Sequence, residues 1–179
     1  KARLSEIKQA IVNAGYEPRA LETGPAAVDE HKAAKEREIR TLWTKFTVAA
    51  VFSVPLLYIA MGAMLGWPLP AFLDAMDFPL RYALVQIALV IPVIAAGYRF
   101  YVVGFRAIWH RAPNMDSLIA MGTTAAVLYS LWSVAGIWNG DFAAVEHLYF
   151  ETAGVIITLI LLGKSLEAVT KGRTSESIK

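Results

Sequence analysis

Two glutamates, Glu151 and Glu167, lie near the ends of the last apolar run of the sequence, which is long enough to cross a lipid bilayer. Sixteen residues separate them, which on a helix is about 24 Å of rise and about 160° of rotation. We expect them at opposite faces of the membrane and on different sides of the helix. A carboxylate at membrane depth is costly, so the default interpretation is a pathway or a contact with another helix. The alternative is that both are hydrated at the interface.

A methionine and a histidine are further candidates. Met121 lies about one turn inside the preceding apolar run, and because consecutive spans are antiparallel we expect it at a depth similar to that of Glu167. A thioether beside a carboxylate makes a weak site that favours soft ions, above all Cu(I); the alternative for Met121 is packing. His147 and Glu151 are four residues apart and can share a helix face. They form either an exit feature or a hydrated interfacial pair.

The composition is that of a membrane protein, since 56% of the residues are hydrophobic and only 18% are charged. The chain has no cysteine, which excludes a disulfide framework and a thiolate metal site within these residues. Residues 1–40 are charged and lack the apolar core of a signal peptide. From the character of both ends we expect the chain to be part of something longer.

Four apolar runs are each close to the ~20 residues that a membrane helix needs. Pro55 and Pro92 lie inside the first two runs and are expected to kink them. The sequence therefore predicts an all-α polytopic membrane protein with four transmembrane helices. These spans are residues 46–65, 80–96, 118–138 and 148–166.

The segments outside the spans are more polar. Residues 1–21 combine a helical apolar pattern with a short extended piece, which predicts a soluble α+β remnant. Residues 22–41 are rich in Gly, Pro, Ala and charge, which indicates a linker that becomes a hydrophilic helix near the membrane. The transmembrane domain is then 42–167, and 168–179 begins a further cytoplasmic connection.

Helical periodicity continues beyond the break at Ala96 and Gly97, over residues 98–111. Arg99, Arg106 and His110 fall within a sector of about 60°, and most other positions are aromatic or aliphatic. This pattern predicts a kinked second helix that continues into an amphipathic helix in the membrane interface. Two interpretations remain open. The basic residues Arg99, Arg106, His110 and Arg111 are either a flank whose arginines reach the interface or a docking platform for an acidic soluble partner.

Lysine and arginine are distributed unevenly among the connections. They concentrate in the N-terminal flank, in the connection between spans two and three and in the C-terminal flank, whereas the other two connections hold only Arg81 and several acids. The positive-inside rule then places both termini in the cytoplasm. Glu151 would lie outside and Glu167 inside.

The string from Asn114 to Ser130, NMDSLIAMGTTAAVLYS, followed by Tyr149-Phe150-Glu151 and the LLGK run to Glu167, resembles the copper-transporting heavy-metal P-type ATPases. The Ala96-Gly97 break resembles that family's kinked second helix, where a Gly-Gly pair is usual. Residues 4–21 resemble the end of its ferredoxin-like metal-binding domain. The resemblance covers essentially the whole chain and is more specific for the class than for the ion.

The resemblance implies part of an ATP-driven Cu(I) exporter of the bacterial inner membrane. It implies that Met121 and Glu167 help form the site where Cu(I) enters from the cytoplasm, that Glu151 lies on the release path, and that the platform receives an acidic copper chaperone. Pro92, Ala96 and Gly97 would form a hinge. ATP and Mg²⁺ would act only in the full-length protein, because the family's phosphorylation and Cys-Pro-Cys motifs are not in this sequence. No catalytic residue and no nucleic-acid partner is expected here.

Two alternatives accompany this interpretation. One keeps the pump but makes the ion Zn, Cd or Co, since Met121 only favours copper. The other is a four-helix membrane scaffold without an enzyme domain.

Overall fold

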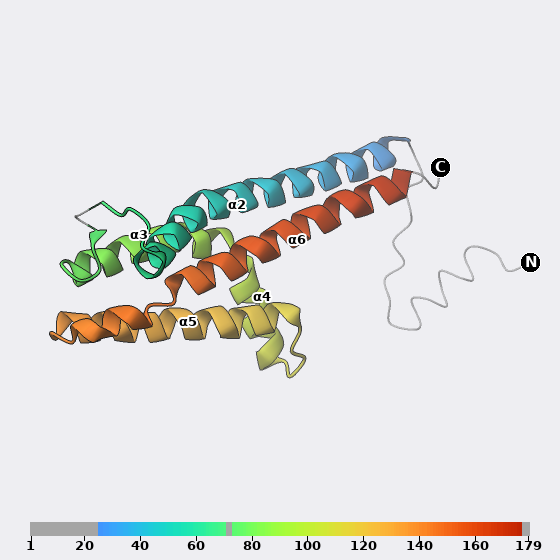
Figure 1. Cartoon of the computed structure of the whole chain (residues 1–179). Coiled ribbons are helices and arrows are strands. Elements are labelled where there is room, and N and C mark those ends of the chain that lie inside the picture. The colour runs from blue at the N-terminus through green and yellow to red at the C-terminus, as the bar shows by residue number, and fades with distance from the viewer. Residues whose placement is uncertain (1–24, 71–72, 177–179) are drawn as a thin grey trace, which may run out of the picture. The chain divides into compact units, whose positions relative to one another are not determined.

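The computed structural model describes residues 25–70 and 73–176, and every element assigned within them is helical. Figure 1 shows the helices, which are α2 (Pro25–Leu65), α3 (Pro79–Ala96), α4 (Tyr98–Trp109), α5 (Met115–Trp138), the short 3-10 helix η2 (Phe142–His147) and α6 (Phe150–Glu176). The predicted all-α architecture is confirmed for the described residues. The α+β remnant predicted over 1–21 lies outside them.

Among the residues that the structure describes, four helices are long and apolar enough to cross a membrane, as the sequence predicts. The segments that qualify are Ala33–Gly62, Pro79–Ala96, Met115–Trp138 and Phe142–Lys171. The helix α2 begins within the predicted linker, and Pro55 lies inside it just as Pro92 lies inside α3. The chain divides into two compact units, Lys1–Arg37 and Glu38–Lys179. The contacts described below all belong to the second unit.

Local sequence signals set the helix ends. Gly66 follows α2 with a φ of 67°, a left-handed conformation that glycine adopts without steric cost. Gly97 separates α3 from α4, and its carbonyl already accepts a hydrogen bond from the Phe100 amide. The start of α5 is capped by Asn114, in a capping box completed by Ser117.

The helix that carries both glutamates, α6, packs against three others. Its residue Gly154 faces α2 so closely that a Cβ atom there would lie 3.1 Å from Leu56. On another side, a Cβ at Gly97 would lie 2.6 Å from the Ile157 Cγ2 atom. The helix α6 thus contacts α2, α3 and also α5. Its residue Ile157 is fully buried. The central position of α6 brings residues from every other long helix within reach of it.

Candidate functional site

The two glutamates of α6 have different surroundings. Glu151 lies in the first turn and is half-buried; its Oε1 atom accepts a hydrogen bond of 3.0 Å from the Thr152 hydroxyl, whereas its Oε2 atom is buried without a hydrogen-bond partner. The side chain of Glu167 is 58% exposed and pairs with Lys171 one turn further on. Only the first carboxylate therefore retains a buried oxygen that can accept a ligand.

The structure does not place Met121 at the level of Glu167. The helices α5 and α6 are antiparallel, and the pair Asp116–Lys164 fixes their register. Met121 lies five residues beyond Asp116, and Glu167 lies three residues beyond Lys164 in the opposite direction, so the two are about 12 Å apart along the axes. Met121 is 57% exposed. A single ion site formed by these two residues remains a prediction, because in this arrangement they lie at different depths.

The expectation that His147 and Glu151 share a helix face was wrong. His147 ends η2, Leu148 is extended, and α6 begins only at Phe150. Serines of α5 hold this junction, since Ser133 Oγ donates to the His147 carbonyl at 3.1 Å and Ser130 Oγ accepts from the Tyr149 amide at 2.7 Å. The break arises because these bonds replace the helical pattern between the two residues.

A polar junction joins α4 to the start of α5. Ser117 Oγ lies 2.9 Å from the Gly104 carbonyl oxygen, to which it donates, and it accepts from the Asn114 amide. Asn114 Oδ1 in turn accepts from the Ser117 amide at 3.0 Å. A Cβ atom at Gly104 would lie 2.4 Å from the Asp116 carbonyl oxygen, so only glycine allows this approach.

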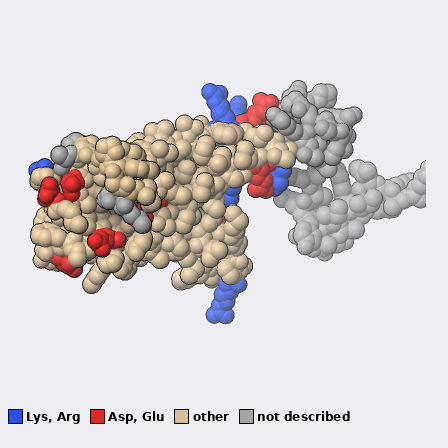
Figure 2. Space-filling model, in the orientation of Figure 1, with Lys and Arg blue, Asp and Glu red and all other residues tan. Residues whose placement is uncertain are grey.

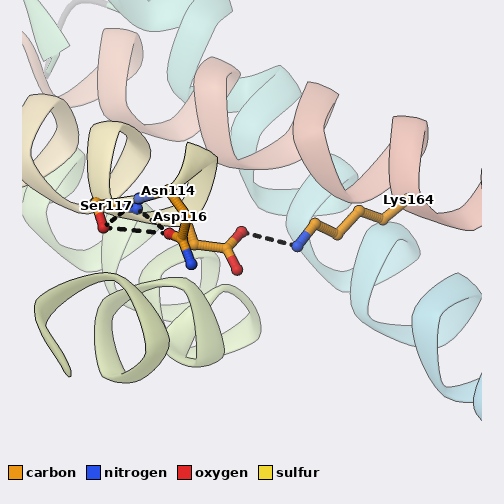
Figure 3. Close-up of polar contacts among 4 residues, drawn as sticks. All are labelled: Asn114, Asp116, Ser117 and Lys164. Atoms are coloured by element: carbon orange, nitrogen blue, oxygen red, sulfur yellow. Dashed lines mark hydrogen bonds and ion pairs between the residues drawn. The ribbon is translucent and has the colours of Figure 1, made fainter. Parts of the chain in front are cut away.

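The same junction extends to α6 through an ion pair. Figure 3 shows Asp116 reaching across to Lys164, with 2.8 Å between Oδ1 and Nζ. The two side chains are only 19% and 34% exposed, and the Lys164 ammonium also lies 4.8 Å from the centroid of the Phe100 ring on α4. Sequence reasoning missed this pair. The signal was a lysine inside an apolar span, which demands a partner. We call Phe100, Gly104, Asn114, Asp116, Ser117 and Lys164 the α4 junction.

The predicted platform residues are all on the surface: Arg99, Arg106, His110 and Arg111 are exposed. A second stripe of α4, apolar and aromatic, is exposed beside them and consists of Tyr98, Val102, Phe105 and Trp109. Tyr101 points elsewhere, and burial raises the pKa of its phenol, which keeps the hydroxyl protonated at neutral pH. Figure 2 shows charged side chains gathered toward the two ends of the helices on this face, with a wide uncharged band between them.

Side chains that commonly bind metals are dispersed. Within the described ranges 25–70 and 73–176, no three His, Asp or Glu residues converge on one point. The hinge residues predicted at Pro92, Ala96 and Gly97 lie in the last two turns of α3 and at its end.

Comparison with known proteins gives matches along the whole chain. A copper-transporting ATPase of Helicobacter pylori is 32% identical over 185 residues, which cover 100% of this chain. A copper-exporting P-type ATPase of Bacillus subtilis is 35% identical over 181 residues, again covering 100% of the chain. The chain is homologous to one segment of the copper-transporting P-type ATPases. The family resemblance drawn from the sequence is thus confirmed.

These relatives are much longer than the chain, which spans 24% of the Helicobacter protein and 21% of the Bacillus protein. A probable copper-importing P-type ATPase A of Enterococcus hirae is 36% identical over 180 residues, covering 96% of the chain and 22% of that relative. No family model matches the chain. No solved structure matches it.

Proposed function

We propose that this chain is part of an ATP-driven Cu(I) pump. It would provide contacts where the ion enters the membrane and where it leaves. The observation that supports this most is the homology to copper-transporting P-type ATPases along all of the chain. Residues 42–167 would be its transmembrane domain. ATP and Mg²⁺ would act in the full-length protein, and both termini of this segment would face the cytoplasm of a bacterial cell, as the distribution of lysine and arginine favours.

In this proposal α6 provides one carboxylate at each end of the path. Glu167, near the basic end, would receive Cu(I) together with Met121, and Glu151 would assist release at the other end. The axial separation between Met121 and Glu167 fits two successive contacts of a moving ion better than one site of two ligands. Weak, sequential contacts suit transport, because a tightly held ion would not leave.

The exposed basic residues of α4 support a docking role for this helix. Arg99, Arg106 and His110 form one stripe beside the aromatic stripe of Tyr98 and Trp109, and the α4 junction fixes the helix to α5 and α6. An acidic copper chaperone would be attracted by this charge, while the aromatic stripe lies in the membrane interface. The direction of pumping is proposed as export, although the Enterococcus relative is named an importer.

The test uses two substitutions in the full-length protein, Met121→Leu and Glu167→Gln. Each removes one ligand group with little change in volume, and we expect the KM for Cu(I) to rise about ten-fold, the scale seen when groups around a metal are removed. Copper-stimulated ATP hydrolysis and copper transport into vesicles are the measurements, with Zn²⁺ and Co²⁺ compared in parallel.

Matched controls are Met115→Leu and Glu38→Gln, which make the same chemical changes at exposed positions outside the proposed path. If hydrolysis and transport are unchanged in both Met121→Leu and Glu167→Gln, the proposed path for the entering ion is wrong. Stimulation by Zn²⁺ or Co²⁺ and not by Cu(I) would refute copper as the ion.

A further inference from the structure

A cavity of about 790 Å³ lies beside Glu151. Its walls come from the end of α2, the segment after it, α3, η2 and the start of α6. Among the residues that line it are Tyr82 and Gln86 of α3 and Glu151 of α6, together with Met61 and Asp74. We call it the Gln86 cavity.

Gln86 is the unexplained group in this wall. It is 1% exposed, yet neither its Nε2 nor its Oε1 atom has a hydrogen-bond partner. Glu151 lines the same cavity, and its Oε2 atom is likewise buried and unpartnered. Among the side chains that the structure describes, Gln86 and Glu151 contribute three of the four buried polar atoms that lack a partner. A neutral donor and a carboxylate acceptor, both unsatisfied, therefore border one cavity.

Tyr82 shows that Gln86 is not required to join the helices. The two residues are four apart in α3 and lie on the same face. The Tyr82 hydroxyl already donates to the Ile59 carbonyl of α2 at 3.2 Å, which ties α3 to α2. Tyr82, Gln86 and Glu151 all line the cavity. Gln86 has no such structural bond, so an apolar residue would fit its place in an apolar helix better.

We propose that Gln86 is a positioning residue for Glu151 on the release path, which rests on the pump function proposed above. The amide Nε2 donates to a water in the cavity, and this water donates to Glu151 Oε2 and keeps the carboxylate turned toward the departing ion. An amide suits this task because it donates without carrying a positive charge. A lysine or arginine in its place would compete with the cation for the carboxylate.

The decisive variant is Gln86→Met in the full-length protein, which keeps the length of the side chain and removes the amide. Because the amide makes no direct hydrogen bond to another side chain, and methionine gains apolar contacts in its place, we expect the Tm to change by less than about 2 °C. Because Glu151 then loses its donor, we expect the kcat of ion-stimulated ATP hydrolysis to fall about ten-fold, with little change in KM. Gln86→Asn keeps an amide and should retain most of the kcat.

A spectroscopic arm tests the hydrogen bond without relying on pumping. The infrared carboxyl band that disappears in Glu151→Gln belongs to Glu151, and Gln86→Met should shift this band, whereas Leu69→Ala, which only enlarges the same cavity, should not. A band that does not move in Gln86→Met overturns the proposal. So does a Tm that falls by more than about 4 °C in Gln86→Met, which would make the residue structural, and so does an unchanged kcat. A wild-type protein without copper-stimulated hydrolysis would refute the pump function, while the infrared result would still decide the hydrogen bond.

Discussion

The α4 junction and the Gln86 cavity differ in how their polar groups are satisfied. At the junction, the Ser117 hydroxyl, the Asn114 amide oxygen and the Asp116 carboxylate each have a partner within 3.1 Å. In the cavity, both polar atoms of Gln86 and one oxygen of Glu151 have none. A fully satisfied buried network holds one geometry, whereas an unpaired buried polar group carries a cost that a partner would remove. The contrast is between an end of the molecule whose polar groups are all satisfied and an end that can still accept hydrogen bonds.

The largest expected effect concerns the sides of the membrane that these two regions face. Met76 beside the cavity is 81% exposed and Trp109 at the end of α4 is 87% exposed. Because the chain has no cysteine of its own, Met76→Cys and Trp109→Cys each provide a single thiol. We expect a membrane-impermeant maleimide to label Met76→Cys from outside the cell and Trp109→Cys only in inverted vesicles.

The unsubstituted chain gives the background for this labelling. If both cysteines react from the same side, α3 does not place the two regions across the membrane, and the orientation drawn from the positive-inside rule is refuted.

The second effect is steric and belongs to the junction. In Gly104→Ala the new methyl group would meet the Asp116 carbonyl oxygen at 2.4 Å and the Ala120 Cβ at 2.8 Å. Backbone has to move, and we expect a loss of about 1–3 kcal/mol in the free energy of unfolding. Thermal unfolding in detergent measures it.

Gly122→Ala on α5 is the matched control, since a Cβ at Gly122 meets no atom within 4 Å. Alanine favours a helix over glycine by about 1 kcal/mol, so this variant should be neutral or more stable. Equal stability of the two variants would show that α4 is not held by close packing at Gly104.

The smallest expected effect comes from the ion pair. A double-mutant cycle of Asp116→Asn and Lys164→Met should give a coupling free energy of about 1 kcal/mol, because both side chains are mostly shielded from water. The more exposed pair Glu167–Lys171, treated in the same way, should show no measurable coupling. A coupling at Asp116–Lys164 that vanishes with added salt would place that pair in water and remove it from the junction.

Sequence reasoning was most reliable where one residue decides the outcome. Gly66 and Gly97 end their helices where predicted, and the four apolar runs are helices. Length and composition suffice for such features.

The contacts between helices could not be predicted in this way. Membrane helices are apolar around most of their circumference, so the pattern does not tell which face packs on which neighbour. Gln86 was therefore read as one more residue of a span. The register of α5 and α6 also appears only when the two helices are packed together. This register pairs Asp116 with Lys164 and separates Met121 from Glu167. The extended Leu148 was missed because it depends on Ser130 and Ser133, far away in the sequence.

Gly97 gives the molecule a mechanical property that no single helix has. Gly97 lies between α3 and α4 and packs directly against Ile157 of α6, because glycine has no side chain to separate them. Ile157 lies between Glu151 and Glu167 along the helix. A rotation or axial shift of α6 would therefore press Ile157 against Gly97 between α3 and α4. This contact joins the helix that carries both carboxylates to the point where α3 ends and α4 begins.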